Sequence, residues 1–356
     1  MADLISFARG VPAPECLPVE ALADCARAAL ERDGRTILSY GPSPGYAPLR
    51  AWIAGRHGVD PSRIFLTNGS LQGFVFLAQR LARGKRVLVE RPSYDRPLKI
   101  LRELGAEVVG LHCDEEGLDP DALEDALGSG EAPAFLYLIP TFQNPSGRTL
   151  SEERRRRIVE LAQAHDLLVL EDDPYGLVRF DGEPLPSLFD LSGGTVAYSS
   201  SFSKTIAPGL RVGWFVFPEA LAKEIEATAT ATYITPVLLG QATVYEFVDR
   251  GLFEPNLERV RGLLGARRDA MVKAIERELP GVRSTRPDGG YFLWLELDGV
   301  DAAELLPRAE QAGVTFVKGT DFDGPPSSLR LAYSFVSLDE IDEGVVRLAA
   351  ALPAAV

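Results

Sequence analysis

The chain has 356 residues, of which 46% are apolar and 25% are charged, the composition of a globular protein large enough for two domains. Its formal net charge of −14 argues against a general nucleic-acid-binding surface, because a phosphate backbone requires a basic field. No run of 18 or more apolar residues predicts a membrane span, and the first residues lack the features of a signal peptide, so we expect a cytoplasmic protein.

The first forty residues contain an irregular stretch that leads into a helix. We expect residues 1–40 to cross the boundary between two domains and to pack on the smaller one. From about residue 60 to residue 215, short apolar runs alternate with helical patterns. The predicted strands are 63–66, 86–90, 107–111, 134–139, 166–171 and 195–199, and the predicted helices between them include 71–82 and 95–104. This alternation predicts an α/β fold in which a mostly parallel sheet is covered by helices.

A further helix is expected to begin after Ser151, whose hydroxyl can cap it. The four arginines at 154–157 lie on this helix, and we predict that they form a solvated face. After residue 250 the pattern changes to a long helix at 255–279, followed by further strands and helices. We therefore expect a large domain at 41–250 and a smaller α/β domain at 251–356.

Several polar motifs follow the predicted strands directly, and the carboxyl ends of strands are where such sheets carry their sites. In "LTNGSLQGF", the turn before a helix can bind a phosphate through backbone N–H groups and Ser70, although a simple helix cap explains it equally. In "ERPSYDRP", Tyr94 can stack on a ligand ring or merely pack in its loop. In "PTFQNPSG", Asn144 can donate to a ring oxygen or simply form a turn.

Two further motifs carry charge. In "LLVLEDDPYG", one of three consecutive carboxylates can pair with a protonated ring nitrogen, while solvation readily explains the other two. In "SSSFSKTIAPGLRVGW", Lys204 is one of only six lysines in the chain. A nearby cation such as Arg211 and partial desolvation would lower the pKa of Lys204 and favour imine formation, and Ser201 with Arg211 can hold a phosphate. Together the five motifs predict a pyridoxal 5'-phosphate site with Lys204 as its Schiff-base residue.

The cysteines and histidines indicate no metal site. Cys16, Cys25 and Cys113 are sparse and lack paired spacing, so neither a disulfide framework nor a zinc site is expected. The three histidines, His57, His112 and His165, lie far apart in the chain.

The ordered motifs "YGPSPGYAPLR", "TNGS", "PTFQNPSG", "EDDPYG", "SFSKTIAPGLRVGW" and "LRLAYS" resemble the class I/II aminotransferase family of fold-type I pyridoxal-phosphate enzymes. The resemblance covers nearly the whole chain and is strongest to the 2-aminoadipate and aromatic aminotransferase branch. It also extends to the enzyme-like domain of certain bacterial transcription regulators. A regulator would need a DNA-binding module before residue 1, so we expect an enzyme.

The resemblance implies a role for each matching residue. Lys204 forms the internal aldimine and moves the substrate proton, Asp172 pairs with the ring nitrogen, and Tyr94 completes the catalytic set by stacking on the ring. The cofactor-binding residues are Ser70, the backbone N–H of Leu71, Tyr94, Asn144, Asp172, Tyr175, Ser201, Lys204 and Arg211, with Tyr40 reaching the phosphate of a neighbouring subunit in a homodimer. The substrate-binding residues are Arg330, which grips the α-carboxylate, together with Gly10 and Asn144.

The departures from the family pattern lie mostly on the substrate side. Arg9 stands where the family usually has a small residue, Lys318 stands where proline is common, and Leu71 replaces the usual glutamine in the phosphate turn. The predicted reaction is transfer of an amino group from an L-amino acid to a 2-oxo acid. The alternative is a cyclisation, elimination or oxidation of an amino acid on the same cofactor in a specialised pathway.

Overall fold

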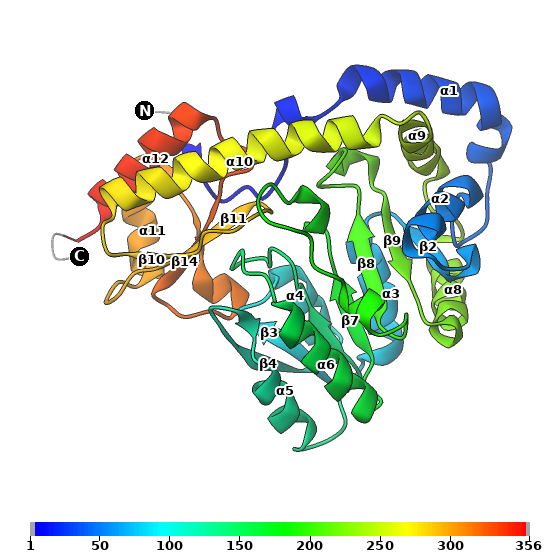
Figure 1. The fold of residues 1–356 in the computed structure, drawn as a ribbon, viewed down its shortest axis with the longest axis horizontal. Coiled ribbons are helices and arrows are strands. Elements are labelled where there is room, and N and C mark those ends of the chain that lie inside the picture. The colour runs from blue at the N-terminus through cyan, green and yellow to red at the C-terminus, as the bar shows by residue number, and fades with distance from the viewer. Residues whose placement is uncertain (1–3, 354–356) are drawn as a thin grey trace.

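The structure is a computed structural model that describes residues 4–353. A large sheet occupies its centre (Figure 1), with strands β2 (Ile64–Thr67), β3 (Arg86–Arg91), β4 (Glu107–Asp114), β5 (Gly117–Leu118), β6 (Leu136–Leu138), β7 (Val169–Asp172), β8 (Ala197–Ser201) and β9 (Gly213–Val216). Their order in the sheet is β2-β9-β8-β7-β6-β3-β4-β5. All strands run in one direction except β9 and β5, which are antiparallel to their neighbours. The carboxyl ends of the parallel strands therefore meet at one edge of the sheet.

Helices cover both faces of this sheet, which explains why its strands read as continuous apolar runs. One face packs on α3 (Ser70–Leu81), α4 (Asp95–Glu103) and α8 (Glu219–Tyr233). The other face packs on α2 (Ala47–His57), α5 (Pro120–Leu127), α6 (Glu152–Ala164), α7 (Leu188–Leu191) and α9 (Leu238–Asp249). Alternation along β3 illustrates the arrangement, since Val87 and Val89 join the first core and Leu88 joins the second.

A second, antiparallel sheet lies beside the first. It contains β10 (Arg283–Ser284), β11 (Phe292–Glu296), β14 (Ser328–Ala332) and β13 (Val317–Lys318), in that order. Helices α11 (Ala302–Gln311) and α12 (Leu338–Ala351) accompany it, and the long helix α10 (Phe253–Glu278) runs from α9 to α12 across the top of Figure 1. The structure thus confirms an α/β fold with a large, mostly parallel sheet.

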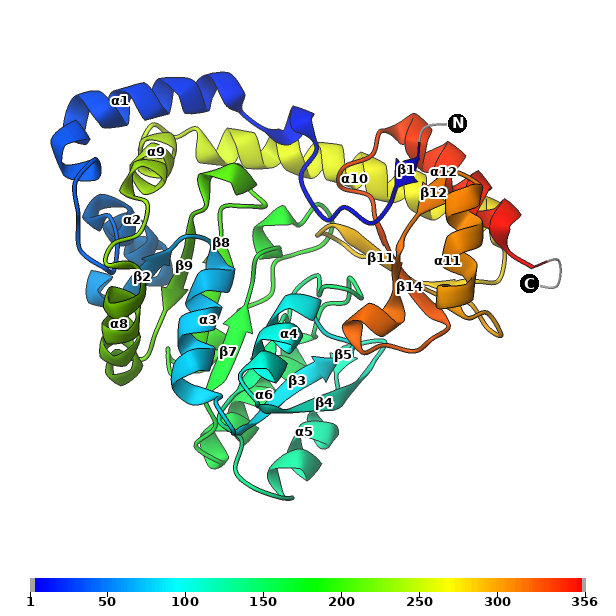
Figure 2. The same ribbon diagram turned by 180° about the vertical axis from the view of Figure 1, so that it is seen from behind.

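The first forty residues contact both parts of the molecule. Strand β1 (Ile5–Ser6) pairs with β12 (Val314–Thr315), beside the second sheet, whereas α1 (Val19–Ile37) packs along α9 of the first. Figure 2 shows this segment crossing from one part to the other. Short 3-10 helices at Pro14–Cys16, Pro61–Arg63, Gly176–Val178, Pro208–Leu210 and Gly319–Phe322 complete the regular structure. The domain boundaries expected near residues 40 and 250 remain predictions.

The helix that begins after Ser151 confirms one prediction and corrects another. The Ser151 hydroxyl accepts a hydrogen bond from the Arg154 amide at 3.3 Å, as an N-cap does. The predicted solvated face is wrong for Arg155, whose side chain is 1% exposed. Its guanidinium faces the sheet and donates to three carbonyl oxygens and to the Thr141 hydroxyl, so its hydrogen-bonding groups are satisfied without water.

Residues 4–353 contain neither a membrane-spanning helix nor a metal-binding cluster. None of the helices in this range combines the length and apolar character needed to cross a bilayer. Over the same range, no group of three or more histidine, cysteine, aspartate or glutamate side chains is arranged to hold a metal ion.

Candidate functional site

A cavity of about 210 Å³ opens at the carboxyl edge of the large sheet. Nine of the residues selected from the motifs line it: Ser70, Leu71, Tyr94, Asn144, Asp172, Tyr175, Ser201, Lys204 and Arg211. They come from the loops after β2, β3, β6, β7 and β8. The parallel arrangement of these strands brings the five motifs together, because each strand delivers its loop to the same edge.

One end of the cavity is built to receive an anion. The turn after β2 places Gly69 at a φ of 88°, and α3 begins at Ser70, so the first backbone N–H groups of this helix lack intrahelical partners. The Arg211 guanidinium lies against the turn and donates to the Asn68 carbonyl at 3.1 Å. The backbone angle favours glycine at residue 69, and a Cβ there would also displace the Arg211 guanidinium from the turn.

Asp172 lines the cavity, and one of its carboxylate oxygens has no hydrogen-bond partner among the described residues. Its Oδ2 accepts a hydrogen bond from the Tyr137 hydroxyl at 2.8 Å, whereas its Oδ1 is buried without a partner among the described residues. Burial raises the pKa of Asp172 to about 6, although the Tyr137 hydrogen bond acts in the opposite direction. A buried carboxylate oxygen without a partner is unfavourable unless a cation or donor meets it, so this atom marks a ligand contact.

The alternative that the two neighbouring carboxylates are simply solvated is wrong for Glu171, and Asp173, which is half-buried, is hydrogen-bonded within the protein. Glu171 is 1% exposed and accepts the backbone N–H groups of Leu188 and Phe189. Asp173 accepts from the Gly176 amide at 2.7 Å and from the Tyr198 hydroxyl at 3.0 Å, and it belongs to the opposite face of the sheet. Strand alternation therefore gives only Asp172 access to the cavity.

Lys204 is partly buried at the other side of the cavity. Its Nζ donates to the Gly10 carbonyl at 2.8 Å and lies 5.6 Å from the centre of the Tyr175 ring. Burial lowers the pKa of Lys204 to about 8, and the charges of Arg330 and then Arg211 act in the same direction. The shift has the direction expected from the sequence, with burial as its main cause. The neutral, nucleophilic amine is therefore far more populated near neutral pH than it is in a free lysine.

Arg330 lies on β14 of the second sheet and reaches toward the cavity through Asn144. Its guanidinium donates to Asn144 Oδ1 and to the Ala8 carbonyl, both at 2.9 Å, and its Nε has no partner in residues 4–353. The group lies 4.2 Å from the centre of the Phe292 ring and is 7% exposed. Its partners are neutral oxygens, so this buried cation retains the capacity to bind an anion.

Three of the residues singled out earlier lie elsewhere. Tyr40 is 82% exposed and is not part of the wall of the cavity. Arg9 is exposed and stacks over the Phe335 ring at 5.1 Å. Lys318 forms an ion pair with Asp321 at 3.4 Å. Gly10, by contrast, contacts the site through its carbonyl, and a Cβ there would meet the Phe292 ring.

Sequence reasoning missed several contributors, of which Tyr137 and Phe292 are the most direct. Tyr137 holds Asp172, and Phe292 lies against Arg330. Both lie inside apolar strand patterns, where an aromatic residue is expected to be part of the hydrophobic core. Tyr137 in "LYL" carried one usable signal, because a buried tyrosine hydroxyl requires a partner.

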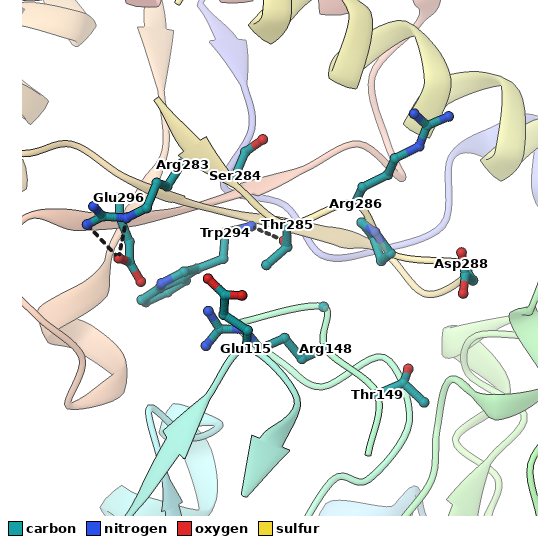
Figure 3. Close-up of a pocket in the computed structure, with 12 residues that line it drawn as sticks. Glu115, Arg148, Thr149, Arg283, Ser284, Thr285, Arg286, Asp288, Trp294 and Glu296 are labelled. Atoms are coloured by element: carbon teal, nitrogen blue, oxygen red, sulfur yellow. Dashed lines mark hydrogen bonds and ion pairs between the residues drawn. The ribbon is translucent and has the colours of Figure 1, made fainter. Parts of the chain in front are cut away.

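A larger cavity, of about 390 Å³, lies away from this site, where the 147–149 loop faces the β10–β11 hairpin (Figure 3). Arginine and acidic side chains both line it, and Arg283 pairs with Glu296 across 3.1 Å. Neither Lys204 nor Asp172 belongs to its wall. Its opposing charges offset one another, so the smaller cavity remains the candidate site.

Comparison with known proteins agrees with this geometry. Residues 3–348 match the family model described as aminotransferase class I and II. A 2-aminoadipate transaminase from Thermus thermophilus is 42% identical over 98% of this chain and 90% of its own length. An aromatic-amino-acid aminotransferase from Thermococcus litoralis is 34% identical over 98% of this chain and 88% of its own length.

Solved structures show the same similarity in three dimensions. The alpha-aminoadipate aminotransferase of Thermus thermophilus, crystallised with N-(5'-phosphopyridoxyl)-L-leucine, superposes with a TM-score of 0.93 at 39% identity. The match covers 98% of this chain and 92% of that structure. The kynurenine aminotransferase of Pyrococcus horikoshii also gives a TM-score of 0.93, at 35% identity over 99% of this chain and 91% of that structure.

Proposed function

The chain belongs to the class I and II aminotransferase family and is a pyridoxal-phosphate-dependent aminotransferase, and from this premise we propose which of its residues hold the cofactor and the amino acid. The observation that carries the proposal is the unpaired Oδ1 of Asp172 in a cavity that also contains Lys204 and an anion-binding turn.

The residues present fit this cofactor. The turn at Gly69, with the N-terminus of α3, Ser201 and Arg211, offers backbone donors, a hydroxyl and a guanidinium to the phosphate. Asp172 offers its free oxygen to the protonated ring nitrogen, and Tyr94 offers its ring as a stacking surface. We assign Asn144 and Tyr175, which line the same cavity, to the ring hydroxyl oxygen. When bound, pyridoxal phosphate supplies an electron-withdrawing ring that stabilises negative charge at the substrate Cα.

Lys204 has two tasks in this proposal. Its neutral amine links the cofactor covalently, which its lowered pKa favours. With a substrate amino acid bound to the cofactor in its place, Nζ would be free to hold the proton of the substrate Cα and to deliver it to C4′. Asp172 keeps the ring nitrogen protonated throughout, because a buried carboxylate pairs with a cation far more favourably than with a neutral atom.

Arg330 is assigned to the α-carboxylate of the substrate. Its planar guanidinium offers two parallel donors that match a carboxylate, and Phe292 and Phe322 shield it from water at 4.2 and 4.9 Å. The substrates are then an L-amino acid donor and a 2-oxo acid acceptor. The similar proteins named above suggest 2-aminoadipate and the aromatic amino acids as the first donors to test. The similar enzymes are named for transamination, so we prefer it to cyclisation, elimination or oxidation.

We further propose that the enzyme is a homodimer in which Tyr40 reaches the phosphate site of the partner. Tyr40 belongs to an exposed apolar patch with Leu38, Ile234 and Val237, all more than half exposed. The Gly41 amide bonds Thr235 Oγ1 at 3.3 Å, so the two halves of the patch are adjacent. The Val237 amide in turn bonds Asn68 at the phosphate turn. An apolar surface beside the site favours a second copy as its occupant.

Cysteine chemistry supports a cytoplasmic location within this proposal. Cys16, Cys25 and Cys113 are all free thiols, and the first two are buried. Unpaired cysteines are typical of a reducing compartment. Fractionation of the native cell with an antibody against the chain would test the assignment.

The function is tested by mixing the holoenzyme with single amino acids in the absence of an acceptor. Transamination predicts a stable conversion of the bound cofactor to its pyridoxamine form, followed by absorbance and identified by mass. Lys204→Ala is the control, which should bind the cofactor without a borohydride-reducible linkage and should not turn over. Release of ammonia, or a cofactor that never reaches the pyridoxamine form with any donor, would contradict transamination.

A further inference from the structure

Two buried tyrosines flank β7, and each donates a hydrogen bond to one of two consecutive carboxylates. Tyr137 lies on β6 and bonds Asp172 Oδ2 at 2.8 Å, while Tyr198 lies on β8 and bonds Asp173 Oδ2 at 3.0 Å. The parallel register explains both contacts. Tyr137 pairs with Leu170 and Tyr198 pairs with Glu171, so each hydroxyl extends two residues along the strand to a carboxylate on its own face.

Only the first of these pairs faces the cofactor cavity. Asp172 lines that cavity, whereas Asp173 lines a separate cavity on the other face of the sheet. Tyr137 is not in the wall of that cavity, although it lines a small cavity of about 40 Å³ that shares Ser70, Tyr94 and Asp172 with it. Its hydroxyl contacts the site through the hydrogen bond to Asp172. Its ring packs edge-on against Phe74, with 5.3 Å between ring centroids, and its side chain is 1% exposed. The donor is therefore held in place by packing on one side and by the carboxylate on the other.

We propose that Tyr137 is a positioning residue, whose hydroxyl fixes Oδ2 of Asp172 so that Oδ1 meets the protonated ring nitrogen of the cofactor. This inference rests on the role that the proposed function gives to Asp172. A carboxylate has two equivalent oxygens and can rotate about its Cβ–Cγ bond. The Tyr137 donor on Oδ2 restricts that rotation and leaves Oδ1 available for the ligand, while the nearby Ser199 side chain also favours the ionised carboxylate.

The same hydrogen bond also keeps the carboxylate ionised. Burial disfavours the charged form of Asp172, and a hydroxyl that donates to the carboxylate favours it. Tyr137 itself stays a neutral donor, because burial raises its pKa well above the ordinary value. Without the donor, Asp172 would be protonated more readily and would attract the ring nitrogen less.

The test compares two ligands that differ only at the ring nitrogen. Pyridoxamine 5'-phosphate and its 1-deaza analogue, in which carbon replaces that nitrogen, both bind without a covalent link to Lys204. Their dissociation constants are measured by calorimetry on the apoprotein of the wild type, Tyr137→Phe and the matched control Tyr198→Phe. The ratio of the two constants isolates the contact between Asp172 and the ring nitrogen, because changes in folding or in phosphate binding affect both ligands equally.

The wild type is expected to bind pyridoxamine phosphate more tightly than the analogue. Tyr137→Phe should reduce this preference about tenfold, the scale of one hydrogen bond to a charged group. Tyr198→Phe should leave the preference unchanged. If Tyr137→Phe is too unstable to titrate, the shifts in Tm that the two ligands produce at saturation give the same comparison.

Three results would overturn the inference, and they distinguish its failure from that of the proposed function. A wild type that binds both ligands equally would remove Asp172 from the ring nitrogen, and the role of Tyr137 would fall with it. If the wild type prefers pyridoxamine phosphate and Tyr137→Phe shows the same preference as the wild type, the role of Asp172 stands and only the role of Tyr137 is refuted. If Tyr198→Phe reduces the preference as much as Tyr137→Phe does, the role of Tyr137 is also refuted, because any change beside β7 would then have the same effect.

Discussion

Replacement of Arg330 by lysine tests the substrate site most directly, since it keeps the charge and changes only its shape. The guanidinium is 7% exposed, lies between two phenylalanine rings and donates to two neutral oxygens. A substrate carboxylate that binds it is therefore desolvated on both sides. An ammonium cannot reproduce the two parallel donors, so Arg330→Lys should lose roughly 2–4 kcal/mol in kcat/KM, about 30- to 900-fold.

The assay is the half-reaction with an amino acid, compared with the amine that lacks its carboxylate. The amine cannot use the fork of Arg330, so its rate should fall much less than that of the amino acid. Arg283→Lys provides the matched control, because Arg283 is exposed, pairs with Glu296 and Asp298, and lines the separate larger cavity. Equal losses for the two substrates, or no loss with the amino acid, would refute the assignment of Arg330 and would make Arg9 the next candidate.

Three further predictions concern the cofactor side. In steady-state kinetics, Asp172→Asn should lower turnover by about 10² or more, while Asp173→Asn should have a much smaller effect. The reverse ranking would identify Asp173, and not Asp172, as the partner of the ring nitrogen. The rate at which the apoprotein links the cofactor, followed by stopped-flow absorbance, should rise with pH and level off above about 8, because the lowered pKa of Lys204 makes its amine mostly neutral there. A rate that continues to rise toward pH 10 would contradict the lowered pKa. Mixed Tyr40→Ala and Lys204→Ala subunits should recover activity if Tyr40 serves the partner, whereas a fully active monomer in sedimentation would exclude the dimer.

The sequence predicted the large sheet well because its strands are buried on both faces and separated by periodic helices. The same logic failed for 219–249, where no element was expected and the structure has α8 and α9. Helix α9 is covered by α1 and α2 and is buried on nearly all sides. It therefore lacks the polar face that makes a helix visible in a sequence.

The sequence predicts those residues of the candidate site that lie at strand ends. It does not predict contacts that depend on the register between strands or on packing between distant parts of the chain. Lys204, Asp172 and Asn144 belong to loops that a parallel sheet must gather at one edge. The contact between Tyr137 and Asp172 depends on the register between β6 and β7, which a single sequence does not reveal. The Gly10 carbonyl reaches Lys204 across 194 positions of the chain. Arg155 was misjudged because the loop carbonyls that satisfy it lie outside its own helix.

One short stretch of chain contacts both Lys204 and Arg330, the residues proposed to link the cofactor and to bind the substrate carboxylate. The Ala8 carbonyl accepts from Arg330, and the Gly10 carbonyl, two residues on, accepts from Lys204. Both bonds favour charged side chains, yet Lys204 must lose a proton to act and Arg330 must turn donors toward a carboxylate. The stretch is continuous with β1, which pairs with β12 beside the second sheet, so any displacement of that pairing moves both carbonyls together. If Arg330 binds the α-carboxylate and Lys204 links the cofactor, as proposed, both side chains must alter hydrogen bonds to carbonyls that lie two residues apart, and a Cβ at position 10 of this stretch would overlap Phe292.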